Sequence, residues 1–177
     1  IDVALNFRSK FLSNKFSAVS DVVFLRGYFE ELLEKSIELH MSPNPLELVD
    51  WMYSKGLDQI LESYKIPTGL LKDAAKSGAA ALSRVSIAIR EAINNNHGHS
   101  VYLSSLKRLA YNDNKTLLFV SAGLSMDRPI EAQGDTLWWG GGFSNLNEQY
   151  YDMLRIVRGY DPDKKGLASG NYGITLD

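Results

Sequence analysis

The distribution of glycine and of apolar residues divides this 177-residue sequence into two parts of different character. Residues 1–97 hold four of the 14 glycines, and their apolar residues recur every three or four positions, as in amphipathic helices. Residues 98–177 hold the other ten glycines and follow no sustained period. We therefore predict a mainly α fold. Its 1–97 part is a compact bundle of about six helices, and its 98–177 part is Gly-rich, irregular or partly β, with one C-terminal helix, packed on the bundle as one domain.

Local chemistry sets several helix boundaries in the first part. Asn44 suits an N-cap, Pro45 suits the first helical position, and Gly56 suits the end of the helix that follows. Pro67 disfavours helix at the residue before it. The predicted helices cover residues 2–19, 20 or 21 to about 40, 45–56, 57–66 and 68–93, and the last range is one helix or two joined at Gly78.

The second part is less regular. A turn at residues 112–115 is flanked by two apolar segments, which permits a hairpin between them. Residues 123–144 resemble a long ordered loop. Asn145 and Glu148 form a capping-box pattern, which predicts a last helix that closes at Gly159.

Charge and cysteine content exclude several classes of protein. The 19 Lys and Arg residues nearly balance the 21 Asp and Glu residues, leaving a net charge of −2. A strongly electrostatic nucleic-acid binder normally carries a basic stripe, so we expect no nucleic-acid partner. The chain contains no Cys, which excludes a disulfide framework, a thiolate zinc site and a Cys nucleophile. The absence of Cys does not fix the cellular compartment.

The start of the chain and its apolar segments bear on processing and on membranes. The sequence begins at Ile1 instead of Met, which favours a processed product or a piece of a longer protein. No basic segment precedes an apolar core, so we expect no signal peptide. No run of about 18 apolar residues occurs, so we expect no membrane span. The localisation is otherwise left unknown.

The most unusual segment places Trp138 and Trp139 directly before three glycines. Trp faces stack on sugars, bases and cations, and glycine allows a close backbone approach to a ligand. A purely structural role is the simpler interpretation, in which the tryptophans fill the side of the bundle and the glycines allow a turn. The sequence nevertheless gives these candidate ligand- or partner-binding residues: Trp138, Trp139, Phe143, Tyr150 and Tyr151.

Two carboxylates near the tryptophans are candidate catalytic residues. Glu131 and Asp135 lie four residues apart. Glycosidases use a pair of carboxyl groups about 5–10 Å apart across the scissile bond. With Trp138 and Trp139 as a sugar platform, this pair suggests a glycan hydrolase as an alternative function.

Metal and nucleotide motifs are weak. His97 and His99 have a spacing that suits a metal on a strand, but their Asn-rich surroundings favour a solvated loop. Asp161–Gly166 begins like a calcium loop and lacks the later ligands, which favours an ordinary turn. The sequence contains no G-x-S-x-G elbow and no phosphate-binding glycine motif. We predict no metal and no cofactor.

The first residues combine basic and aromatic side chains. Arg8, Lys10 and Lys15 alternate with phenylalanines at positions 7, 11 and 16. This pattern is typical of a segment that lies on a membrane or nucleic acid, and equally of the solvated side of a core helix.

These patterns favour a protein–protein interaction or assembly module without enzymatic activity, acting within a larger system. Its expected partner is another protein subunit or a second copy of the chain. The glycan hydrolase is one alternative, and a small toxin or effector domain is another. The sequence leaves open whether the protein is an enzyme.

Overall fold

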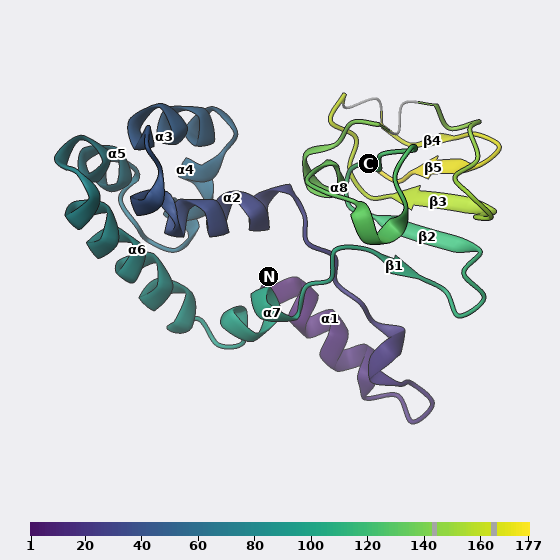
Figure 1. The fold of residues 1–177 in the computed structure, drawn as a ribbon. Coiled ribbons are helices and arrows are strands. Elements are labelled where there is room, and N and C mark those ends of the chain that lie inside the picture. The colour runs from purple at the N-terminus through teal and green to yellow at the C-terminus, as the bar shows by residue number, and fades with distance from the viewer. Residues whose placement is uncertain (143–144, 164–165) are drawn as a thin grey trace. The chain divides into compact units, whose positions relative to one another are not determined.

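The computed structural model describes residues 1–142, 145–163 and 166–177. These residues form two compact units, each of which is discontinuous in sequence. The helical unit contains residues 1–15 and 29–104, and the sheet unit contains residues 16–28 and 105–177 (Figure 1). The mainly α prediction with a partly β second part is confirmed.

Seven of the eight described α-helices belong mainly to the helical unit. They are α1 (Asp2–Leu12), α2 (Tyr28–Ile37), α3 (Pro45–Ser54), α4 (Leu57–Ser63), α5 (Thr68–Ser77), α6 (Ala79–Asn94) and α7 (His99–Ser105). The described residues thus contain more helices than the six or so expected. As predicted, α3 begins at Pro45 behind Asn44. Gly78 separates α5 from α6 with a φ of +98°, a backbone conformation that favours glycine.

The core of the helical unit consists of aliphatic side chains from α2 to α6. α5 packs against α6 and α3, and α4 packs against α3. Burying one such side chain stabilises a fold by about 1.5–3 kcal/mol, so these buried aliphatic side chains provide much of the stability of the helical unit. Its most deeply buried members include Leu32, Val49, Met52, Leu57, Leu61, Leu71, Leu82 and Ile89.

The first two predicted helices are too long. α1 ends at Leu12, and α2 begins only at Tyr28. Before α2 the chain is extended, and the N–H of Arg26 donates to the carbonyl of Lys107 at 2.8 Å, while the N–H of Lys107 donates to the carbonyl of Phe24 at 2.9 Å. Pairing with a segment distant in sequence therefore overrides the helical spacing here.

The sheet unit contains a five-stranded mixed sheet in the order β1-β2-β3-β5-β4. The strands are β1 (Ala110–Tyr111), β2 (Leu117–Val120), β3 (Arg155–Arg158), β4 (Ala168–Ser169) and β5 (Gly173–Thr175). β2, β3 and β5 run parallel, whereas β1 and β4 are antiparallel edge strands. The predicted hairpin is present as β1 and β2. Its turn is fixed by Asn112, whose Oδ1 accepts from the N–H groups of Thr116 and Leu117 at 2.8 Å each.

The helix predicted from Asn145 to Gly159 is wrong. Asn145 does accept a hydrogen bond from the N–H of Asn147 at 3.0 Å, as an N-cap would, but the turn is not continued into a helix. The chain instead enters β3, which lies between β2 and β5. Ile156 is buried at the centre of this sheet, and β-branched residues suit such a position.

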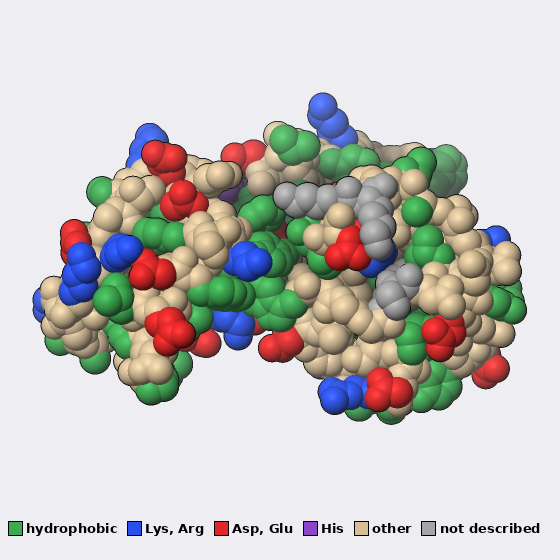
Figure 2. All heavy atoms as spheres, turned by 90° about the horizontal axis from the view of Figure 1, so that it is seen from above, with side chains coloured by type: hydrophobic (Ala, Val, Ile, Leu, Met, Phe, Trp, Pro, Cys, Tyr) green, Lys and Arg blue, Asp and Glu red, His purple; other side chains and the backbone are tan. Residues whose placement is uncertain are grey.

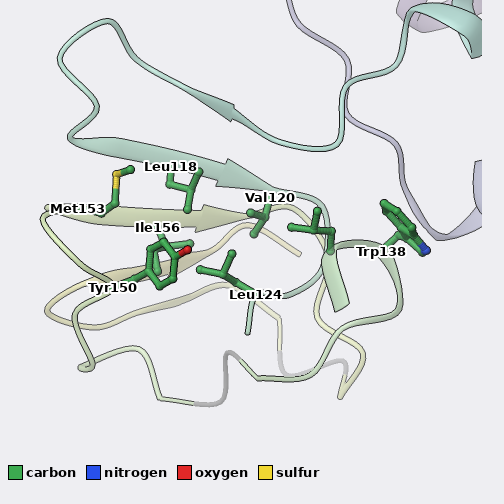
Figure 3. Close-up of a cluster of buried hydrophobic side chains, with 8 residues drawn as sticks. Leu118, Val120, Leu124, Trp138, Tyr150, Met153 and Ile156 are labelled. Carbon is green, nitrogen blue, oxygen red and sulfur yellow. The ribbon is translucent and has the colours of Figure 1, made fainter. Parts of the chain in front are cut away.

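A second core covers one side of this sheet. Figure 3 shows it extending along β2 and β3, with Tyr150 and Met153 toward one end and Trp138 at the other. Trp138 comes from α8 (Thr136–Trp139), a single helical turn in the connection between β2 and β3. The cluster consists of Leu118, Val120, Leu124, Leu137, Trp138, Tyr150, Met153 and Ile156.

Across the described part of the chain, every helix is too short or too polar to span a bilayer.

Candidate functional site

The two tryptophans are held within the sheet unit. The Trp138 side chain belongs to the core and its residue is 7% exposed. The Arg108 guanidinium lies 5.9 Å from its ring centroid, close enough for a cation–π contact. Trp139 is half-buried, and its ring meets the Tyr28 ring edge-on at a centroid distance of 4.9 Å. Both tryptophans thus make their contacts within the sheet unit, whereas the structural interpretation placed them against the helical bundle.

The predicted tyrosines differ in their surroundings. Tyr150 is 1% exposed, and its hydroxyl donates to the carbonyl of Arg128 at 2.6 Å. Tyr151 is 59% exposed and packs its ring against that of Tyr150 at 4.7 Å. Phe143 lies outside the described residues. Among the candidate binding aromatics, the Tyr151 side chain is thus exposed to solvent, whereas the Trp138 and Tyr150 side chains lie in the core.

Two glycines near the tryptophans, Gly123 and Gly140, are required by close packing of the chain on itself. A Cβ at Gly123 would lie 2.6 Å from the carbonyl oxygen of Gly141 and 2.9 Å from that of Thr136. Gly140 has a φ of +83°, and its Cβ would collide with Pro162. The space beside these two glycines, which could have admitted a ligand, is therefore occupied by backbone and side-chain atoms of the protein itself.

Replacing Gly123 with alanine is expected to lower the free energy of unfolding by about 1–3 kcal/mol, because backbone atoms on two sides must move to accept the methyl group. Gly134→Ala is the matched control, since no atom lies within 4 Å of its Cβ position. The control should be neutral or slightly stabilising. Urea denaturation of both variants checks this prediction, and equal stability of the two would contradict it.

The two predicted catalytic carboxylates are both exposed. Glu131 lies in the 3₁₀ turn Ile130–Ala132, and Asp135 directly precedes α8. Between them, the buried Gln133 fixes the loop: its amide donates to the carbonyls of Ser125 and Arg128, at 2.8 Å each. The sequence does not reveal this role, because nothing in it distinguishes a buried glutamine that bonds the loop backbone from an exposed glutamine that bonds water.

A buried ion pair lies at the end of β3, whose last residue is Arg158. The Arg158 guanidinium is 3.0 Å from the Asp161 carboxylate, and the two side chains are 11% and 2% exposed. Asp161 also accepts from the N–H of Asp163 at 3.0 Å, which forms a local turn. The first residues of the segment considered as a calcium loop therefore form a turn with an ion-paired Asp161, and residues 164 and 165 lie outside the described residues.

His99 is a buried, doubly bonded side chain. The expectation of a solvated loop is wrong for this residue, which begins α7 and is 7% exposed, although His97 is exposed. The Nε2 of His99 lies 3.0 Å from Oδ1 of Asp2, and its Nδ1 lies 2.8 Å from the hydroxyl of Tyr64. Because the Asp2 carboxylate accepts only, Nε2 carries the proton, and in the neutral ring Nδ1 accepts from Tyr64.

The His99 side chain forms part of the wall of a cleft of about 440 Å³ in the helical unit. The hydrogen bond from His99 lowers the pKa of the Asp2 carboxyl. Burial raises the pKa of the Tyr64 hydroxyl, and the negative charges of Asp2 and Glu30 raise it further. The cleft therefore brings fixed polar groups together with the negative charges of Asp2 and Glu30.

Replacing Tyr64 with phenylalanine is expected to lower the free energy of unfolding by about 1–2 kcal/mol, because the change leaves Nδ1 of the buried His99 without its donor. Tyr111→Phe is the control, since Tyr111 is 47% exposed at an edge strand. Thermal unfolding followed by circular dichroism measures both. A Tyr64 variant as stable as its control would show that this hydrogen bond contributes nothing.

The outer face of α1 exposes an apolar stripe. Val3, Phe7 and Phe11 are 84%, 56% and 39% exposed, and the rings of the two phenylalanines lie 5.9 Å apart. The three residues follow at intervals of four, so they share one side of the helix. Lys10 is exposed on the same helix and Lys15 follows it. We call Val3, Phe7 and Phe11 the α1 stripe.

A shallow groove lies at the start of α3. It is lined by Pro43, Asn44, Pro45, Leu46, Glu47, Asp50 and Ala75, and its volume is about 610 Å³. Its charged members are both acidic, and one of them, Asp50, is paired with Lys72 at 2.5 Å. We call this surface the α3 groove. Figure 2 shows acidic and basic side chains interspersed elsewhere over the face that it displays.

Comparisons with known proteins add no assignment: no family model, no curated protein and no solved structure matches this chain. Within the described ranges, no three His, Asp or Glu side chains converge to hold a metal ion. Function is therefore inferred from the surfaces described above.

Proposed function

We propose that this chain is a self-assembly module in which the α1 stripe of one copy binds the α3 groove of a second copy. The observation that carries the proposal is the exposure of two neighbouring phenylalanines, Phe7 and Phe11, on a helix of a folded unit. Contiguous apolar side chains at a surface are typical of binding sites.

The charges of the two surfaces are complementary. The α1 stripe is accompanied by Arg8, Lys10 and Lys15, whereas the chain as a whole carries a net charge of −2. The α3 groove joins apolar side chains, such as Leu46, to the acidic Glu47, while its second acid, Asp50, is paired with Lys72. An apolar helix face with basic neighbours suits an apolar groove with an acidic rim, and a helix in a groove is a recurring recognition mode.

One copy does not fill its own groove in this arrangement. Both surfaces belong to the helical unit, and α1 is tied down within it by the bond from Asp2 to His99. Different surfaces of two copies then meet, which is a heterologous contact. Such contacts build rings or open chains of subunits. Pairing of two α1 stripes with each other is disfavoured because it brings like charges together.

Sedimentation velocity over a series of protein concentrations tests the proposal. The wild-type chain should form species larger than a monomer as its concentration rises, and added salt should weaken them. Phe7→Ser and Leu46→Ser should each weaken association at least tenfold, because each removes an apolar contact of the interface. Ile87→Ser is the matched control, since Ile87 is 54% exposed on α6 and belongs to neither surface.

Mixing the two variants distinguishes this contact from a symmetric one. The Phe7→Ser chain retains an intact groove and the Leu46→Ser chain retains an intact stripe, so an equimolar mixture should form a dimer that grows no further. A symmetric contact between stripes would instead let the Leu46→Ser chain dimerise on its own and would give no mixed dimer with the Phe7→Ser chain. A wild-type chain that remains monomeric at millimolar concentration contradicts the proposal.

A further inference from the structure

We infer that the cleft beside His99 binds a small organic cation: an ammonium group carried on an apolar body. The cleft is formed entirely within the helical unit, at the junction of α1, α2, α4 and α7. Its volume of about 440 Å³ suits a compact small molecule. The inference concerns a different surface from the α1 stripe and does not depend on self-assembly.

The charge of the lining selects a cation. Asp2 and Glu30 both line the cleft, and the lining that the structure describes includes no Lys or Arg, so these two carboxylates outnumber the single amino group of Ile1, which also lines it. The electrostatic effect of both carboxylates reaches Tyr64, whose hydroxyl is harder to ionise because of them. The Glu30 charge also acts on the buried Tyr102, whose pKa is raised mainly by burial. An anion placed here would meet the same repulsion.

The remaining lining suits an apolar body. Phe29, Leu33 and Ile60 contribute apolar side chains, and Leu103 adds another from α7. The Phe29 ring is 56% exposed, so its face can contact a ligand. Aromatic faces attract cations, and they also stack against apolar rings. The cleft thus offers apolar contact and negative charge in one site.

His99 holds the polar groups of this site in place. It bonds Asp2 through one ring nitrogen and Tyr64 through the other, and it is itself buried. Three side chains from α1, α7 and the end of α4 are therefore fixed relative to one another before any ligand arrives. A site that is already ordered loses little entropy on binding.

Three probes that share one skeleton and differ in charge test the inference: 2-phenylethylammonium, 2-phenylethanol and 3-phenylpropionate. Isothermal titration with the full chain at neutral pH should rank the cation first, at least tenfold tighter than the alcohol, with the carboxylate weakest. Amide resonances of Gln59, Ser63 and Asn96 should shift with the cation, because these residues line the cleft.

Substitutions of the lining carboxylates then test which of them binds the ammonium group. Glu30→Gln should weaken binding of the ammonium probe about tenfold and leave the affinity for the alcohol unchanged. Glu62→Gln is the matched control, since Glu62 is exposed on α4 and does not line the cleft. Asp2→Asn provides a second test if the Glu30 variant fails to fold. The inference is overturned by equal affinity for the cation and the alcohol, by unchanged binding in the variants, or by no binding of the cation at millimolar concentration.

Discussion

Trp138→Ala is expected to lower the free energy of unfolding by about 3–5 kcal/mol, which is the range for removing a large buried aromatic side chain. The Trp138 residue is 7% exposed and packs with the core cluster between α8 and the sheet, so the substitution leaves a cavity. Arg108 also loses the ring that it faces. Denaturation in guanidinium chloride, followed by circular dichroism, measures the effect.

The matched control is Tyr151→Ala. Tyr151 is 59% exposed, so its truncation should cost below about 1 kcal/mol. A Trp138 variant as stable as the Tyr151 variant would show that the tryptophan is not part of the core. The comparison separates the two interpretations of the aromatic segment, because a binding residue can be truncated without loss of the fold.

Arg158→Met is expected to destabilise the sheet unit by about 3 kcal/mol. The substitution retains the length of the side chain but leaves the Asp161 carboxylate buried without its cation. A buried charge without a partner lowers the free energy of unfolding far more than an exposed charge does, because it has lost its hydration. The transition midpoint in urea measures the loss.

A double-mutant cycle tests whether the ion pair is responsible. Adding Asp161→Asn to Arg158→Met removes the stranded charge, so the double variant should be more stable than the sum of the two single changes predicts. Strict additivity would mean that Arg158 acts through contacts other than the ion pair, such as the hydrogen bond that its Nε donates to the Thr175 hydroxyl at 2.8 Å.

The helices from Pro45 to Asn94 could be predicted because their signals are local. Pro45 fixes a first turn, Gly78 marks a break, and apolar residues between them recur at one period. Each of these signals acts within a few residues. The hairpin of β1 and β2 belongs to the same class, because Asn112 forms its turn by bonding residues four and five positions away.

The errors arise where distant segments decide the structure. The helix predicted from Asn145 to Gly159 includes residues 155–158, but these residues pair as a strand with β2 and β5 on either side. Residues 24–26 likewise bond Lys107, which lies some eighty positions further along the chain. Tertiary pairing outweighs local propensity in both places, and a single sequence does not reveal the partner strand.

The candidate sites likewise divide into features that are visible in the local sequence and features that depend on segments distant in sequence. Trp138 and Tyr151 were both candidate binding residues, but whether the side chain of each is buried depends on the packing of the folded chain. The cleft beside His99 was missed, because its lining comes from residues between positions 1 and 103. The α1 stripe was recognised as a basic and aromatic segment, and the structure adds that its phenylalanines are exposed.

The interleaving of the two units has a consequence for the order in which the protein is made. Residues 16–28 leave the ribosome early, yet most of the unit that contains them is synthesised last. The chain passes between the units at three points, after residues 15, 28 and 104. The helical unit can therefore mature on a nascent chain while the early segment waits for residues 105–177, and a fragment expressed from residue 98 onward would lack the backbone partner of Lys107.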